Sequence, residues 1–358
     1  METKSKGVLK FFRNALILLA LVIVFDQIGG GILHWMYFRQ KTGPNAETTF
    51  TFTKMQADGI ILGSSRGRRN YNPNILADSL GIKMYNAGHD GQTVFYEQAV
   101  IRRVLARFTP KLVIIDLNPE EMYFRDLHYD RLNVLAPYYN DFPDIRDIYL
   151  LKGLHDRMGD PNCFFVKPQI EGTDGWNGFW NKHNAFEPLL LPFNNERVKM
   201  LSATYPDNSN ILDILSGIFK NRKSEMGFKP LKGIITQKKA DDLIKENAAL
   251  RNEKGKKVDA NKLKALENGI ELLQAHGSLV MISMSPALAP FGREPSYDSV
   301  QAVCRRYNIP FKDYSQDSVY LHLQYFFDNH LNKDGANMFS SNLAGDIKRE
   351  FFPNTFSK

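Results

Sequence analysis

Cysteine is scarce in this chain of 358 residues, where only Cys163 and Cys304 occur, far apart in the sequence. Zinc sites need Cys or His ligands at short spacings, and the eight histidines are scattered without an HExxH pattern. The sequence therefore predicts no metal site, and nothing in it indicates an organic cofactor. A single cysteine pair does not define the redox compartment, so a disulfide stays open beside the two buried thiols that we expect.

A basic surface spread along the chain is also missing. The net charge is +7, yet fourteen Lys or Arg stand against six Asp or Glu between Lys220 and Lys264, an excess larger than the whole imbalance. Nucleic-acid-binding domains carry charge in stripes with interleaved aromatic residues, whereas this Ala- and Lys-rich stretch is typical of a solvated helix face. We therefore expect no nucleic-acid partner. With 43% hydrophobic and 24% charged residues, the composition also excludes a disordered chain, a collagen and a polytopic membrane protein.

Long apolar runs are absent except at the N-terminus. There the unbroken segment ALILLALVIVF (15–25) follows several basic residues and continues less strictly to Tyr37, over 23 residues in all. A helix of that length reaches about 35 Å, which is enough to cross a bilayer. The basic flank favours a cytoplasmic N-terminus, and Trp35, Tyr37 and Phe38 stand where an aromatic belt belongs. We expect a single-pass membrane protein whose residues from about 40 onward are periplasmic or extracellular.

Two alternatives for this run stay open. It would also suit a cleaved signal peptide, with the glycines at 29–31 near the cleavage site, and, less well, a buried helix of a soluble protein. Asp26 is costly in lipid and marks a functional position by default, unless it lies at the level of the outer headgroups.

From Ala57 onward, short apolar strands alternate with helical patterns. The strands GIIL, IKMYNA, KLVIIDL and SLVMISMS are predicted at 59–62, 82–87, 111–117 and 278–285, and the helices at 94–108, 260–275 and 335–351. This alternation predicts an α/β fold with a doubly wound, mostly parallel sheet. Continuous apolar strands fit a sheet that is buried on both faces.

The sequence predicts four parts. These are a cytoplasmic tail and membrane anchor (1–38), a linker (39–56), an α/β core (57–124 and 256–358) and a long insertion or cap (125–255). The linker ends in the alternating run TTFTFT, which suggests a short edge strand.

Polar residues follow the predicted strands at their carboxyl ends, where ligands bind in open α/β sheets. Ser64 and Ser65 follow the first strand, the loop NAGHDGQT (86–93) follows the second, Asn118 follows the third, and DNHLN (328–332) lies near the C-terminus. A nucleophilic serine needs a histidine base, which a carboxylate orients, and its oxyanion needs fixed donors. The residue types of a serine acyl-transfer site are therefore present.

These blocks resemble those of the SGNH (GDSL-type) hydrolase superfamily, whose sheet is flavodoxin-like. The resemblance implies that Ser65 is the nucleophile, while Ser64 stands where the family has Asp. We expect the Ser64 hydroxyl to bond within its own turn. The same resemblance places the oxyanion donors at Gly91 and Asn118.

The last block implies that His330 is the base and Asp328 its carboxylate partner. This block departs from the family, because Asp and His are two residues apart instead of three and Phe327 takes the usual Asp position. Either the loop is tighter by one residue, or a carboxylate from elsewhere in the chain orients His330. Three further residues are expected either to line the site or to lie on surface loops: Arg66, His89 and Asp90.

The resemblance extends to the membrane-anchored branch of the superfamily, which includes the D-alanyl-lipoteichoic acid biosynthesis protein and proteins that accompany membrane-bound O-acyltransferases. It implies a Ser65 acyl-enzyme that transfers or hydrolyses an O-acyl group, acetyl above all, on an extracytoplasmic glycan or cell-envelope polymer. The implied partner is an integral membrane O-acyltransferase. Insertion aromatics would stack on sugar rings: Trp176, Trp180, Tyr138 and Tyr139. The alternative is an inactive SGNH-like scaffold that binds glycan or that membrane partner.

Overall fold

The computed structural model describes residues 2–158, 199–208, 211–219, 226–251, 256–289 and 294–352. The chain forms two compact units. We call Met1–Ala46 with Asn133–Arg222 the anchor unit, and Glu47–Leu132 with Lys223–Lys358 the core unit. The predicted insertion is thus divided between the units, and its first and last residues belong to the core unit. The predictions for Cys163, Trp176 and Trp180 lie outside the described residues, and Cys304 is a buried free thiol.

The core unit holds a parallel sheet of five strands in the order β2-β1-β3-β4-β5. The strands are β1 (Gly59–Gly63), β2 (Met84–Asn86), β3 (Leu112–Asp116), β4 (Leu279–Met284) and β5 (Phe311–Asp313). The first four are the predicted ones. Every residue of β1 and β3 is buried, as their unbroken apolar runs require. Strand β5 was not predicted, because its three residues FKD carry no apolar pattern.

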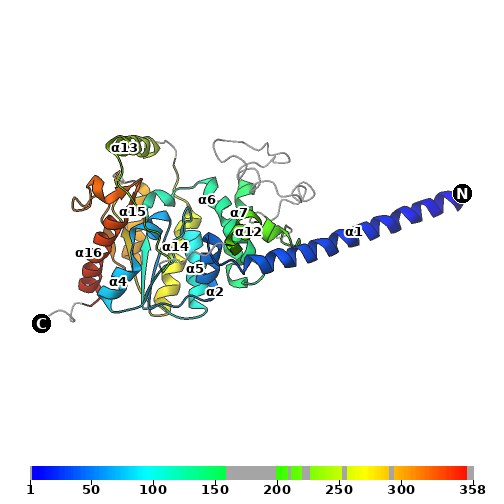
Figure 1. The fold of residues 1–358 in the computed structure, drawn as a ribbon, viewed down its shortest axis with the longest axis horizontal. Coiled ribbons are helices and arrows are strands. Elements are labelled where there is room, and N and C mark those ends of the chain that lie inside the picture. Colours follow the sequence, from blue (N-terminus) through cyan, green and yellow to red (C-terminus); the bar gives the residue numbers. More distant parts are fainter. Residues whose placement is uncertain are drawn as a thin grey trace. The chain divides into compact units, whose positions relative to one another are not determined.

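Helices connect these strands (Figure 1). Those of the core unit include α3 (Ser65–Asn70), α4 (Pro73–Leu80), α5 (Val94–Leu105), α6 (Asp126–Asp130), α13 (Gln237–Arg251), α14 (Ala260–Ala275), α15 (Pro295–Arg306) and α16 (Lys333–Phe351). The predicted helices at 94–108, 260–275 and 335–351 correspond to α5, α14 and α16. Asn332 caps α16, since its side chain accepts a hydrogen bond from the Gly335 N–H at 3.0 Å.

The predicted edge strand in the linker is wrong. Residues Pro44–Thr53 form helix α2 instead. Pro44 begins the helix, where a missing N–H costs nothing, and Phe52 is fully buried. Tertiary packing of this kind overrides the two-residue alternation of Thr and Phe.

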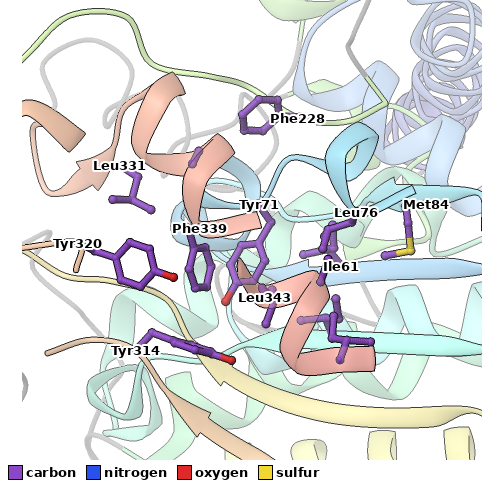
Figure 2. Close-up of a cluster of buried hydrophobic side chains, with 14 of the residues drawn as sticks. Ile61, Tyr71, Leu76, Met84, Phe228, Tyr314, Tyr320, Leu331, Phe339 and Leu343 are labelled. Atoms are coloured by element: carbon purple, nitrogen blue, oxygen red, sulfur yellow. The ribbon is translucent and has the colours of Figure 1, made fainter. Parts of the chain in front are cut away.

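Aromatic rings form the centre of one buried cluster in the core unit (Figure 2). The ring of Phe339, on α16, meets Tyr71, Tyr314 and Tyr320 edge-on, with centroid distances of 5.1, 5.2 and 5.5 Å. Edge-to-face contacts add about 0.5–1.5 kcal/mol each to the burial of the rings. Tyr71 directly follows α3, so this cluster fixes the helix that begins with Ser65.

The anchor unit contains one long apolar helix, α1 (Glu2–Tyr37), which is long and apolar enough to cross a membrane. The other described α-helices of this unit are α7 (Arg146–Met158), α11 (Tyr205–Asn208) and α12 (Ile211–Phe219), of which α11 and α12 pack against α1. Tyr37 is buried, and its hydroxyl donates to the Tyr138 hydroxyl at 3.2 Å. Tyr37 is therefore no part of an aromatic belt, and Tyr138 has no free face for a sugar ring.

Candidate active site

A glycine turn presents Ser65 at the carboxyl end of β1. Gly63 has φ of +144°, and a Cβ there would lie 2.9 Å from the Asp116 carbonyl oxygen, so only glycine fits without strain. The chain then enters α3, with Ser65 as its first residue. The Ser65 side chain is partly exposed, while its neighbours Ser64 and Arg66 are buried.

A β-hairpin brings His330 to this serine. Strands β6 (Phe326–Phe327) and β7 (His330–Leu331) pair antiparallel, and Asp328 and Asn329 form the turn between them. The His330 Nε2 lies 2.8 Å from the Ser65 Oγ. The hairpin is tied to α3 directly, because the Leu331 N–H donates to the Asn70 side chain at 3.0 Å. This hydrogen bond links the hairpin that carries His330 to the helix that carries Ser65.

The other imidazole nitrogen has no carboxylate on it. His330 Nδ1 is buried and has no hydrogen-bond partner within the described ranges. Asp328 has φ of +67°, as the turn requires, and its carboxylate accepts the Asn329 N–H at 2.8 Å. The structure therefore brings Ser65 and His330 together but does not hydrogen-bond Asp328 to His330. The reason is the tight hairpin: Phe327 pairs with His330, and Asp328 is left in the turn.

The electrostatic surroundings keep His330 neutral. Burial, and then the positive charges of Arg69 and Arg66, lower its pKa to about 4, against the smaller opposite effects of Asp328 and Asp90. A neutral imidazole whose Nε2 accepts from the serine carries its proton on Nδ1. This is the protonation state that a general base needs at neutral pH.

The loop after β2 lies against α3. The Asn86 side chain donates to the carbonyls of Gly67 and Tyr71, at 2.8 and 2.9 Å, and accepts the Gly88 N–H at 3.0 Å. A Cβ on Gly88 would lie 2.6 Å from the backbone nitrogen of Arg68, so the loop backbone contacts the helix that carries Ser65. Sequence reasoning missed this role of Asn86, although an asparagine at a strand end is a common loop anchor.

Gly91 lies in this loop with its carbonyl fixed. It has φ of +75°, and its carbonyl accepts a hydrogen bond from Arg131 Nη1 at 2.7 Å. Its N–H donates to no other group in the part of the chain that the structure describes. The preceding Asp90 is held by ion pairs to Arg68 and Arg69, at 3.0 and 2.9 Å. The Gly91 N–H is thus a backbone donor without an acceptor among the described residues. Hydrogen bonds and ion pairs hold the Gly91 carbonyl and the Asp90 carboxylate beside it.

The three residues expected to line the site take structural roles. Arg66 is buried and donates to the Ser285 hydroxyl at 3.1 Å and to the Ser285 carbonyl. Asp90 holds the loop to α3. His89 is buried, which lowers its pKa to about 4, and it lines a cavity of about 10 Å³, the size of one water.

Asn118 follows β3 and caps a short 3₁₀ helix, η1 (Pro119–Met122). Its side-chain oxygen accepts the Glu120 N–H at 3.0 Å. The cap fixes the amide plane through the oxygen and leaves its NH₂ group as the donor end. Capping and oxyanion donation are therefore compatible in one side chain.

Ser64 does not bond within its own turn, contrary to the prediction. Its hydroxyl donates to Glu121 Oε1 at 2.7 Å, across to η1. Burial raises the Glu121 pKa to about 7, and the nearby Asp116 adds to the rise. Glu97 is also buried, with its pKa raised mainly by burial and further by Glu121 and Asp116. A carboxyl-rich layer thus lies under the serine turn.

A buried lysine supports this layer. Lys262, on α14, is fully buried, and its Nζ donates to the carbonyls of Glu121 and Tyr123 and to His128 Nδ1, at 2.9, 2.5 and 2.6 Å. Burial lowers its pKa to about 8. The prediction that the basic stretch is a solvated helix face fails at this position. No sequence signal distinguishes Lys262 from the exposed Lys264 nearby.

The described residues contain no group of three or more His, Cys, Asp or Glu that could hold a metal ion. Neither a scan against protein-family models nor a search of curated proteins finds a match to this chain. The geometry of the site is therefore the main basis for assigning its function.

Proposed function

We propose that the protein is a membrane-anchored serine acyltransferase or esterase of the SGNH type. One observation carries the proposal, the hydrogen bond of 2.8 Å between Ser65 Oγ and a neutral His330. The strand order β2-β1-β3-β4-β5 supports a doubly wound, flavodoxin-like architecture for the core unit. Ser65 follows β1 of that sheet, and His330 lies in β7 of the hairpin that reaches it.

The proposed reaction has two displacement steps. Ser65 Oγ attacks the ester carbonyl carbon while its proton passes to His330 Nε2, and the alcohol leaves with that proton. An incoming hydroxyl, from a sugar or from water, then attacks the acyl-enzyme and gives its proton to His330, which passes it to Ser65 Oγ as the bond between the acyl carbon and Oγ breaks. The N–H groups of Ser65 and Gly91 and the amide of Asn118 are the proposed donors to the oxyanion.

The substrate class follows from the resemblance and from α1. The apolar N-terminal helix favours work at a membrane surface. The resemblance implies O-acyl groups, acetyl above all, of an extracytoplasmic glycan or cell-envelope polymer as the substrate. The proposed partner is an integral membrane O-acyltransferase that supplies the acyl group. We place the N-terminus in the cytoplasm and the core unit in the periplasm or outside the cell.

One observation favours the alternative, an inactive scaffold that binds glycan or the membrane partner. It is the lack of a hydrogen-bond partner on His330 Nδ1 within the described ranges. A Ser-His pair without an orienting carboxylate is a weaker catalyst than a full triad. The pair is still competent, because its base is neutral and already bonded to the nucleophile.

Labelling with a fluorophosphonate probe, followed by peptide mass spectrometry, tests the proposal. The label is expected on Ser65, and both Ser65→Ala and His330→Ala should abolish it. Hydrolysis of a chromogenic acetyl ester should fall at least about 10³-fold in each variant. The matched controls are Ser299→Ala and His276→Ala in the core unit; Ser299 is partly exposed, His276 is exposed, and both side chains bond only to local carbonyls.

Two results would contradict the proposal. Labelling that survives Ser65→Ala removes the assignment of the nucleophile. A wild-type protein that takes no label and hydrolyses no ester, but still binds soluble glycan, supports the inactive scaffold instead. Adding an oligosaccharide acceptor and measuring its gain in mass then separates a transferase from an esterase.

A further inference from the structure

Helix α1 has two parts with different surroundings. The described apolar side chains up to Phe25 are exposed. From Asp26 onward one face of the helix is covered by other segments of the anchor unit. The change falls inside the apolar run that the sequence predicts as a single span.

Asp26 is the first residue of the covered face, and its carboxylate is fully bonded. It accepts hydrogen bonds from the Ser202 hydroxyl (2.7 Å), the Thr204 hydroxyl (2.6 Å) and the backbone N–H groups of Ala203 (2.7 Å) and Thr204 (3.2 Å). The segment 200–204 is a series of turns and bends outside regular helix. A carboxylate therefore holds irregular backbone against α1.

The contact continues along the helix at a spacing of four residues. Gly30 has no room for a Cβ, because Ala203 fills that position. The His34 imidazole lies 3.3 Å from Asp207 and 3.1 Å from Asp141. Asp26, Gly30 and His34 thus form a face of α1 that contacts protein. Lipid chains could not replace these contacts, because they offer no hydrogen bonds.

This contact locates the edge of the bilayer. Irregular backbone does not occur in contact with lipid chains, because its polar groups have no partners there. The segment 200–204 must therefore lie outside the hydrocarbon core, and so must Asp26. Lys10 and Arg13 lie within reach of the opposite interface, to which long basic side chains extend. The spanning part is then 7–25, about 28 Å long as a helix.

An exposed leucine lies at this level. Leu201 directly precedes the residues that bond to Asp26, and 77% of it is exposed. We propose that α1 leaves the outer face of the bilayer at Asp26, and that the segment 199–204 lies on the membrane surface with Leu201 inserted among the lipid chains. The inference rests on the membrane anchor of the proposed function and adds a second, peripheral contact with lipid. It fixes the position of the anchor unit at the surface.

Single-cysteine variants of the full chain test this inference. They are made on a Cys163→Ser, Cys304→Ala background, labelled with a small environment-sensitive fluorophore and reconstituted in phosphatidylethanolamine–phosphatidylglycerol vesicles. Leu201→Cys and Ile23→Cys should be quenched by lipids with a nitroxide on the acyl chain, each at least about twofold. Ile32→Cys should be quenched only by a water-soluble quencher. The matched control is Leu212→Cys, which is 75% exposed but lies on α12, whose Gly217 carbonyl bonds to Lys41 beyond the helix end.

Each result has one meaning. An Ile32→Cys label that behaves like Ile23→Cys shows that the bilayer continues past Asp26 and overturns the boundary. A Leu201→Cys label that behaves like Leu212→Cys overturns the inserted leucine. Protein that does not float with the vesicles at all contradicts the anchor itself, and with it the membrane part of the proposed function.

Discussion

Two regions beside the serine turn differ in whether their buried polar atoms have hydrogen-bond partners. Below the turn, Lys262 directs its Nζ to three acceptors at 2.5–2.9 Å. On the hairpin side, the His330 Nδ1 is buried with no hydrogen-bond partner among the described residues. A satisfied network fixes the backbone around it, whereas a buried donor without an acceptor costs free energy. The first region therefore supports the fold, while the second leaves Nδ1 of the proposed base without the carboxylate that a full triad has.

The largest effect on stability is expected from the satisfied region. Lys262→Met leaves two carbonyls and the His128 nitrogen buried without a donor, which should lower the free energy of unfolding by about 3–5 kcal/mol. Urea unfolding followed by circular dichroism measures the change. The control Lys264→Met, at an exposed position of the same helix, should stay within about 0.5 kcal/mol of wild type. A loss of under about 1 kcal/mol for Lys262→Met would mean that water replaces the ammonium group.

The difference between these regions also explains what the sequence can and cannot predict. Strands β1 and β3 are unbroken apolar runs, so their places follow from the pattern alone. Ser65 and His330 follow from the order of their blocks along the chain. Lys262 has no such signal, because its role depends on carbonyls that other segments bring to it. Such partners exist only after tertiary folding.

The misplaced details have equally specific causes. Ser64 was expected to bond locally, but η1 brings Glu121 within reach of its hydroxyl. Asp328 was expected on His330, but a two-residue hairpin turn places it beside the strand pair instead. In both cases the partner depends on which segments folding brings together, and the spacing along the sequence does not specify this.

An intermediate effect is expected at Glu121, which lies between Lys262 and the serine turn. The pKa of Glu121 is raised from 4.5 to about 7, so the folded state binds its proton more tightly than the unfolded state. Stability is then lost as pH rises from 4.5 to 7, by about 3 kcal/mol. Glu121→Gln removes this loss and keeps an acceptor for Ser64. The variant should therefore gain more stability, relative to wild type, at pH 8 than at pH 4.

Urea unfolding at both pH values measures this difference. The control is Glu246→Gln, at an exposed position of α13, whose effect should be the same at both pH values. An equal effect of Glu121→Gln at pH 4 and pH 8 would show that the carboxyl ionises as it does in water. The layer under the serine turn would then be hydrated.

The smallest effect is expected at Asp328, which tests the unsatisfied region directly. Its carboxylate accepts the Asn329 N–H and acts on His330 only through its charge, which raises the pKa of the imidazole slightly. Asp328→Asn should therefore reduce kcat/KM for an acetyl ester by less than about threefold, whereas loss of a true triad carboxylate costs up to about 10⁴-fold.

The pH dependence of the reaction sharpens this test. The base is neutral above its pKa of about 4, so kcat/KM should be level above about pH 5 and fall in more acidic solution. Without the negative charge of Asp328, that fall should move to lower pH. A severe loss of kcat/KM at every pH would instead show that the Asp328 carboxylate bonds to His330 Nδ1 when substrate binds. The buried imidazole nitrogen would then have a partner during the reaction, as the Lys262 ammonium has in the structure described here.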